Sequence, residues 1–307
     1  MGATLEEGSP AYARHLLRHF PLNGGRGLRP ALVLAAGSLK QKGKTKKPIK
    51  NKRLLKAAAA IELVHCGSLL HDDVVDEAQL RRHSPTINRL FGTREAVLLG
   101  DYFLSRAFTL VLELKIPRAT SAFVRLMEAM VKGELLELDK SAKIETTEED
   151  AFHIIELKTG SLFAEACYIG GLVAGLPEAR LKELHTFGME AGRAYQLTDD
   201  LLDATSLSSQ LGKDTGNDLL QGKPTLPLVH ALQLAPDNVC EEFTRGSSSA
   251  FPHIAELLCD KRVRTACMDK AREATQRALS ATENLQDNSA RKCLRQFAVF
   301  ASERAAR

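Results

Sequence analysis

Two short segments of the chain are rich in aspartate. They are "HDDVVDEA", with Asp72, Asp73 and Asp76, and "TDDLLDAT", with Asp199, Asp200 and Asp203. In each segment the first and last carboxylates stand four residues apart, which on a helix places both on one face, one turn apart. The residues before both segments are largely apolar, so the two carboxylate faces are predicted to begin inside a helical bundle, where they would repel one another across a partly buried cleft. Protonation or a cation must relieve that repulsion.

A hard divalent cation matches this chemistry. Mg²⁺ takes oxygen ligands and shares them with phosphate groups, whereas zinc would require His or Cys. For one such cluster, an N-cap or a solvated helix face is the commoner explanation. Two clusters about 125 residues apart, each on an apolar helix, favour metal binding instead.

Basic residues near these clusters indicate what the metal ions hold. They are Arg81 and Arg82 after the first cluster, Lys158 in "ELKTGSL", Lys213 and Lys223 in "GKDTGNDLLQGKPTLP", and Arg26 and Arg29 in "GGRGLRP". Any one of them alone would more often face solvent. Guanidinium and backbone N–H groups in a glycine-rich setting can approach a phosphate closely. Together with a metal cluster they predict a pocket for two diphosphates, one bridged by Mg²⁺ and one held by arginines.

The elements that must position these groups are helices. Almost every long segment repeats apolar residues at i, i+3, i+4 and i+7, and strand-like alternation is nearly absent. Gly, Pro, Asn and Asp mark the breaks between segments. The pattern predicts about ten or more helices in a single all-α domain over residues 1–307.

The composition, the N-terminal sequence and the cysteine spacing indicate in which compartment the protein is found. The chain has 307 residues, of which 44% are hydrophobic, and no window of about 18 uninterrupted apolar residues. The N-terminus lacks the pattern of a signal peptide, and the six cysteines show no disulfide or zinc spacing, so we expect a cytoplasmic protein with free thiols.

The charge is distributed unevenly along the chain, because one run is strongly basic. Residues 40–53 hold eight basic residues and no acid, and without them the net charge of +4 becomes −4. A solvated loop is the main interpretation, and peripheral contact with anionic membrane lipids is the alternative. Nucleic-acid binding is not expected, because the chain has no Trp, its aromatic content is 5%, and the run has no interleaved aromatic residue.

The ordered set of motifs resembles the trans-isoprenyl diphosphate synthases, also called polyprenyl synthetases, over nearly the whole chain. The motifs are "GGRGLRP", "ELVHCGSLLHDDVVDEAQLRRHSPTIN", "LLGDYFL", "KTGSLF", "YQLTDDLLDAT" and "GKDTGNDLLQGKPTLP". The resemblance implies an all-α bundle around a deep central cavity, a homodimer, and head-to-tail condensation of isopentenyl diphosphate with an allylic diphosphate primer.

The resemblance also implies roles for single residues. The Mg²⁺ ligands fall on Asp72, Asp76 and Asp199, with Asp200 and Asp203 supporting the second site. Contacts to the allylic diphosphate fall on Arg81, Lys158, Lys213 and Lys223, and contacts to isopentenyl diphosphate on Arg26, Arg29, His65 and Arg82. Thr159 and Gln196 match positions that line the reacting carbons. The reaction would be ionisation of the allylic C–O bond, attack by the isopentenyl double bond, and proton loss.

Three positions depart from the family pattern. The family usually has Lys-Arg where this chain has Arg26-Gly27, Pro where it has Asp214, and Gln where it has Glu137. None of these is a predicted metal ligand, so we expect them to change substrate affinity more than activity.

Gly67 and Ser68 precede Asp72 by one helical turn, on the path that a hydrocarbon tail would follow. Family members with short products usually have large residues there, so these small residues predict an open tunnel and a long-chain polyprenyl product. Close helix packing is the competing explanation for them. Two alternative functions also stay open: a short-chain farnesyl or geranylgeranyl diphosphate synthase, and a non-catalytic subunit of a heteromeric synthase.

Overall fold

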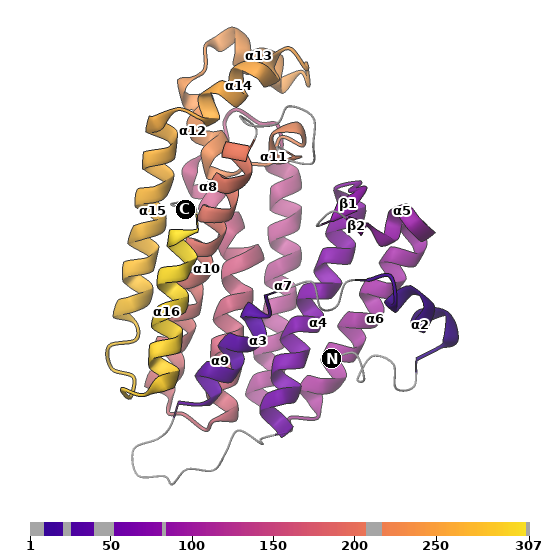
Figure 1. Cartoon of the computed structure of the whole chain (residues 1–307), viewed down its shortest axis with the longest axis vertical. Helices are drawn as coiled ribbons and strands as arrows, with labels where there is room; N and C mark the ends of the chain where they lie inside the picture. Colours follow the sequence, from indigo (N-terminus) through magenta and orange to yellow (C-terminus); the bar gives the residue numbers. More distant parts are fainter. Residues whose placement is uncertain (1–8, 21–25, 40–51, 82–83, 207–216, 305–307) are drawn as a thin grey trace. The chain divides into compact units, whose positions relative to one another are not determined.

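The computed structural model describes residues 9–20, 26–39, 52–81, 84–206 and 217–304 (Figure 1). Within these ranges helices predominate, and the strands are one antiparallel pair of two-residue strands, β1 (Leu80–Arg81) and β2 (Ser84–Pro85). The all-α prediction is therefore confirmed. Most of the basic run, residues 40–51, lies outside the described residues, and so do Arg82, Lys213 and Asp214.

The chain divides into two compact units, Met1–Val124 with Ala166–Leu181, and Arg125–Glu165 with Lys182–Arg307. The division falls within α7 (Pro117–Lys140), α9 (Ser161–Val173) and α10 (Glu178–Ser206). Unit 1 also holds α2 (Ala11–Leu17), α3 (Leu28–Gly37), α4 (Lys52–Val75), α5 (Ile87–Phe91) and α6 (Thr93–Leu112). Unit 2 also holds α8 (Glu148–Ile155), the π-helix η1 (Glu156–Gly160), α11 (Asn217–Leu220), α12 (Leu226–Leu234), α13 (Asp237–Thr244), α14 (Ala250–Leu258), α15 (Lys261–Ser280) and α16 (Ser289–Glu303). The prediction of one domain over residues 1–307 stays a prediction.

Unit 1 is organised around α4, which lies beside α6 (Figure 1). Its alanine-rich first half has high helix propensity, and its inner face is buried. Glycines bring the two helices close together. A Cβ atom on Gly100 would lie 2.3 Å from His71 Nε2, and one on Gly67 would lie 3.1 Å from Leu104 Cδ2. The close contact fixes the end of α4 that carries the first aspartate cluster.

Helix α4 is also long and apolar enough to cross a membrane by length and composition alone. In the most apolar part of the helix, 56% of the residues are buried inside the protein. Such burial is typical of the core helix of a globular protein, and α4 packs against α3 and α6.

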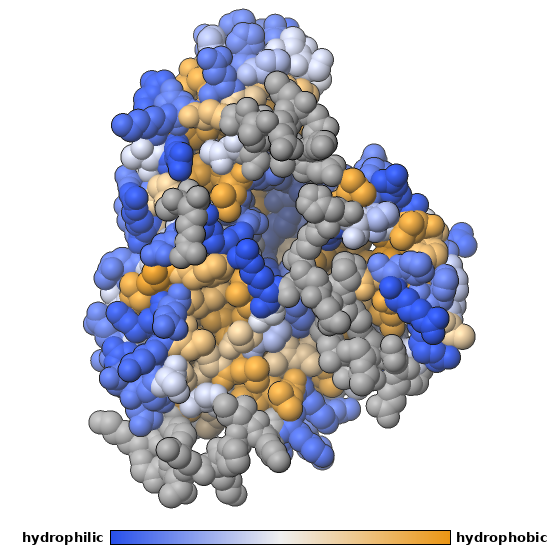
Figure 2. Space-filling view, in the orientation of Figure 1, coloured by the Kyte–Doolittle hydropathy of each residue, from blue (hydrophilic) through white to orange (hydrophobic). Residues whose placement is uncertain are grey.

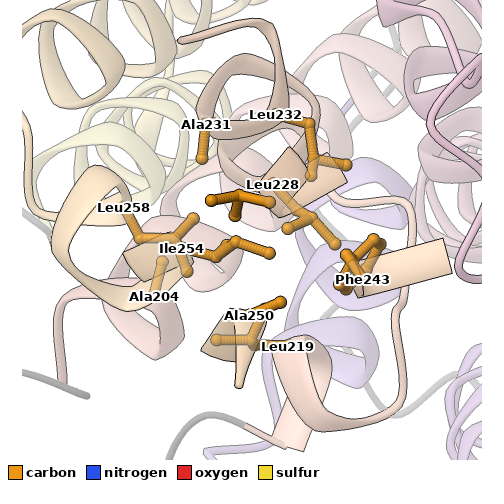
Figure 3. Close-up of a cluster of buried hydrophobic side chains, with 10 residues drawn as sticks. Ala204, Leu219, Leu228, Ala231, Leu232, Phe243, Ala250, Ile254 and Leu258 are labelled. Carbon is orange, nitrogen blue, oxygen red and sulfur yellow. The ribbon is translucent and has the colours of Figure 1, made fainter. Parts of the chain in front are cut away.

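Unit 2 packs α10 against the C-terminal helices. One apolar cluster joins α10 and α12 to α15 through Leu201, Leu226 and Met268. A second cluster joins the end of α10 to α11, α12, α13 and α14 through Ala204, Leu219, Leu228, Phe243 and Ile254 (Figure 3). Because Ala204 directly follows Asp203, this second cluster holds the second aspartate segment in place. The outer side of α15, at the left edge of Figure 2, is mostly hydrophilic, as the amphipathic pattern requires.

A buried carboxylate in unit 2 makes stability depend on pH. Glu165 on α9 is 5% exposed, and burial raises its pKa from the ordinary 4.5 to about 7. Arg125 on α7 opposes this shift through a 3.2 Å contact to Glu165 Oε1, while Oε2 has no hydrogen-bond partner among the described residues. The Arg125 side chain is 56% exposed, so solvent weakens its effect and burial dominates.

Because the folded state binds the Glu165 proton more tightly than the unfolded state does, the contribution of Glu165 to stability is largest below about pH 4.5 and is lost as pH rises through about 7. We expect Glu165→Gln, which imitates the protonated acid, to raise the free energy of unfolding at pH 8 by about 2–3 kcal/mol relative to wild type. At pH 5 the two proteins should differ little. Urea unfolding at both pH values measures this, with the exposed Glu241→Gln as control. A gain of equal size at both pH values would contradict the assigned pKa.

Candidate functional site

The first aspartate cluster lies at the C-terminal end of α4 and directly after it. The backbone N–H of Asp76 donates to the carbonyl of Asp72 over 2.8 Å, so the helical turn continues and the two carboxylates stand one turn apart as predicted. Both are half-buried, whereas Asp73 between them is 3% exposed. Asp72 and Asp76 are thus the accessible pair in this cluster.

Asp73 has a separate role, because it binds Arg81. Arg81 Nε donates to Asp73 Oδ1 over 2.7 Å, and Asn88 donates to the Asp73 carbonyl over 3.0 Å. Burial raises the pKa of Asp73, and the Arg81 guanidinium partly offsets this. The ion pair fixes Arg81 of β1, a predicted diphosphate contact, beside the first cluster. The sequence did not reveal this pairing, although Arg81 was a candidate for the site and Asp73 belongs to the first aspartate cluster.

The other predicted site residues of unit 1 lie on α4 or at the start of α3. Arg26 is exposed and Arg29 is half-buried on α3, and between them Gly27 has φ +59°, a left-handed conformation that favours glycine. His65 is half-buried on α4. His71 faces α6, with Nε2 3.4 Å from Asp101, and so points away from the Asp72 face as expected. Ser68 is half-buried, and its hydroxyl donates to the His65 carbonyl over 2.9 Å.

Gly67 differs from Ser68, because it is buried in the contact between α4 and α6. A Cβ atom there would also lie 3.2 Å from the Gly100 carbonyl oxygen. For Gly67 the structure therefore favours close helix packing, the competing explanation. Ser68 keeps its predicted role in chain length.

The second aspartate cluster lies on α10. Asp199 has a side chain that is 46% exposed, and it accepts a hydrogen bond from Arg304 Nη2 over 2.5 Å. The Arg304 guanidinium also stacks on the Tyr195 ring, with Cζ 4.2 Å from the ring centroid. Sequence reasoning missed Arg304, which stands 105 residues from Asp199 along the chain.

Asp200 is buried and forms one end of a hydrogen-bond chain. Thr159 Oγ1 donates to Gln196 Oε1, and Gln196 Nε2 donates to Asp200 Oδ1, each over 2.7 Å. Burial raises the pKa of Asp200 well above its ordinary value, and the negative charge of Asp218 raises it further. The chain of bonds fixes the Gln196 amide in one orientation. Asp200 and Asp203 also line a small pocket with Asp218, which sequence reasoning did not single out.

Lys158 and Thr159 lie on η1, a π-helical turn inserted between α8 and α9. Such turns often occur at functional sites, because the extra residue redirects neighbouring side chains. Arg193 of α10 donates a hydrogen bond to Glu156 of the turn, and a second one to Glu190 on its own helix orients the guanidinium. Sequence periodicity did not predict this turn.

The predicted diphosphate contacts Lys158 and Lys223 meet the acids of α7. Lys158 Nζ lies 2.6 Å from Glu134 Oε2 and 2.8 Å from Glu137 Oε1, and Lys223 Nζ lies 3.9 Å from the same Glu137 oxygen. Gly133 allows α7 to approach, because a Cβ atom there would lie 2.6 Å from Lys158 Cγ. Glu137 therefore faces both lysines.

The aspartate carboxylates of the two clusters are compatible with a divalent cation whose remaining coordination positions are filled by other ligands. Among the described residues, no group of three or more His, Cys, Asp or Glu side chains is arranged to hold a metal ion. Mg²⁺ is commonly bound by one or two carboxylates together with water and substrate phosphates, so accessible pairs such as Asp72 and Asp76 match its needs. In the second cluster, the positively charged Arg304 guanidinium already binds the Asp199 carboxylate.

Comparisons with known proteins match most of the chain to one family. The polyprenyl synthetase family matches residues 10–258. An all-trans-nonaprenyl-diphosphate synthase (geranyl-diphosphate specific) of Rhodobacter capsulatus is 35% identical over 291 residues, which cover 94% of this chain and 87% of that protein. Heptaprenyl diphosphate synthase component 2 of Geobacillus stearothermophilus is 34% identical over 301 residues, covering 95% of this chain and 88% of that protein.

A solved structure gives the same result for the fold. The polyprenyl synthase of Caulobacter crescentus CB15, complexed with calcium and isoprenyl diphosphate, is similar with a TM-score of 0.89 and 32% identity, over 98% of this chain and 92% of that one. The shared motifs, the helices that carry them and these matches lead to one conclusion: the chain belongs to the polyprenyl synthetase family.

Proposed function

We propose that this protein is a Mg²⁺-dependent trans-prenyltransferase that condenses isopentenyl diphosphate with an allylic diphosphate, head to tail, and releases a long-chain all-trans polyprenyl diphosphate and diphosphate. The observation that carries the proposal is the pair of aspartate clusters, each with accessible carboxylates one turn apart on a helix. Membership of the family and the nonaprenyl product named for the Rhodobacter relative support it.

In this proposal, Asp72 and Asp76 bind metal in unit 1, and Asp199 and Asp203 bind metal in unit 2. Mg²⁺ bound there would neutralise the negative charge that develops on the departing diphosphate. Calcium in the complex of the Caulobacter neighbour supports a divalent ion of this kind. Asp73 does not bind metal in this assignment, because its buried carboxylate is occupied by Arg81.

The basic groups divide the two substrates between them. Arg81, Lys158, Lys213 and Lys223 would hold the allylic diphosphate, and Arg26, Arg29, His65 and Arg82 would hold isopentenyl diphosphate. The hydrogen-bond chain from Thr159 through Gln196 to Asp200 would keep the Gln196 amide fixed beside the reacting carbons. A fixed dipole stabilises a developing carbocation without reorganisation during the reaction.

The proposal extends to assembly and location. Val131, Leu135 and Leu138 form an exposed apolar face on α7, flanked by the ion pairs Glu128–Lys132 and Asp139–Lys143. Each end of this face carries one acid and one base, so a second copy of the helix lying antiparallel would meet opposite charges. We therefore propose a homodimer.

The free cysteines support a reducing, cytoplasmic location.

A heteromeric assembly is the second candidate, because the Geobacillus relative is named as component 2 of its synthase. One experiment separates the two. The purified chain is incubated with labelled isopentenyl diphosphate, Mg²⁺ and allylic primers of several lengths, the products are sized, and its mass in solution is measured by light scattering. We expect a dimer that makes a long-chain product by itself. No turnover with any primer would refute the proposal for the isolated chain and favour the heteromeric alternative.

A further inference from the structure

Four charged side chains of unit 2 form a compact group that we call the lysine–glutamate cluster: Glu134, Glu137, Lys158 and Lys223. Each side chain in this group is less than a quarter exposed, from 14% for Glu137 to 23% for Lys158. Ion pairs with this burial are screened by salt and water much less than surface pairs are. The charges of the cluster therefore interact strongly with one another and with any ion that enters.

The two acids of the cluster are not equivalent. Among the described residues, Glu134 forms an ion pair with Lys158 alone, over 2.6 Å. One oxygen of Glu137, Oε1, lies 2.8 Å from the Lys158 nitrogen and 3.9 Å from the Lys223 nitrogen. Glu137 is thus the carboxylate that the two lysines share.

The charge balance of the cluster bears on anion binding. Within these four described side chains, two carboxylates and two ammonium groups cancel, so they offer an incoming anion little net attraction while Glu137 lies against the lysines. A carboxylate oxygen and a phosphate oxygen make the same kind of charge-assisted hydrogen bond to a lysine. They therefore compete for the same donors.

We propose that Glu137 is an internal competitor of the diphosphate, which occupies Lys158 and Lys223 when the site is empty and so sets the affinity for the allylic substrate and for the diphosphate product. This inference rests on the proposed function, in which the two lysines bind that diphosphate. By weakening the hold on diphosphate, Glu137 promotes release of the product after each condensation.

The test is Glu137→Gln, which removes the charge and keeps the shape. The Gln oxygen can still accept from Lys158, and Glu134 still holds that lysine, so the geometry should survive. We expect the Kd for inorganic diphosphate, measured by calorimetry at saturating Mg²⁺, to fall about five- to tenfold. The KM for the allylic primer should fall by a similar factor, and inhibition by added diphosphate should strengthen, while the KM for isopentenyl diphosphate should stay the same.

Two matched variants control for charge and position. Glu273→Gln removes an exposed carboxylate from α15 and should leave the Kd unchanged. Glu134→Gln changes the net charge of the cluster as much as Glu137→Gln does, but it releases only one lysine. Its effect should therefore be the smaller of the two.

An unchanged or increased Kd in Glu137→Gln would overturn the inference, and an increase would mean that Glu137 positions the lysines instead. Equal effects of the Glu134 and Glu137 variants would also overturn it, since net charge alone would then explain the result. The calorimetric readout does not depend on turnover. If the wild-type chain binds diphosphate but makes no prenyl product, the proposed function fails while this inference is still tested.

Discussion

Asp199→Ala should lower the turnover number by about three orders of magnitude, and Asp72→Ala should do the same. Each removes one carboxylate of the proposed metal site, and loss of metal-assisted charge stabilisation costs several kcal/mol in the transition state. The structure predicts that folding survives the Asp199 substitution. Removing Asp199 takes this carboxylate away from the Arg304 guanidinium, whose side chain is 15% exposed, so we expect some loss of stability. The guanidinium keeps its contact with the Tyr195 ring, so we expect the fold to be retained.

The control for this prediction is Asp269→Asn. Asp269 is also an aspartate on a helix paired with a basic residue, Arg272 over 2.9 Å, but it lies outside both clusters and is 56% exposed. It should keep the full rate. Turnover is measured as labelled isopentenyl units incorporated per second, and thermal unfolding checks the fold. If either Ala variant retains more than about a tenth of the wild-type rate, these aspartates do not hold a metal ion that the reaction requires.

The sequence predicted the helices and the accessible aspartates for a physical reason. Apolar periodicity and the four-residue spacing from Asp72 to Asp76 are local properties, and a helix converts spacing directly into position on a face. The structure places those two carboxylates one turn apart, as that rule requires. The predicted orientation of His71 away from the same face follows from the same rule, and the structure places the His71 side chain against α6.

Contacts between distant segments could not be predicted in this way. Arg304 reaches Asp199 from the C-terminal helix, and no local pattern links residues that far apart. Glu137 shares its oxygen with Lys158 and Lys223 because Gly133 lets α7 approach the π-helical turn, which itself breaks the periodicity used to recognise helices. The residue types were visible in the sequence, but their pairing depends on tertiary packing.

Packing also decides which of the two small residues before Asp72 can control product length. Gly67 is buried against α6, so a phenylalanine there must displace Leu104 or the backbone at Gly100. Overpacking of this kind costs about 1–3 kcal/mol or more. We expect Gly67→Phe to lower the free energy of unfolding by at least that amount. Gly67→Ala, which needs a shift of only a few tenths of an ångström, should be much milder.

Ser68→Phe should instead change the product and keep the fold. Ser68 is half-buried, and its hydroxyl donates only to the carbonyl of His65 on the same helix, so its loss should cost little. A phenyl ring at this position, one turn before Asp72, would stand across the proposed path of the growing chain. We expect shorter polyprenyl products, sized by chromatography, with an unchanged rate for the first condensation because the short primer does not reach the ring. Leu55→Phe, at an exposed position near the start of α4, should leave the product length unchanged. If Ser68→Phe yields the wild-type product length, or if Leu55→Phe shortens the product equally, Ser68 does not limit the chain.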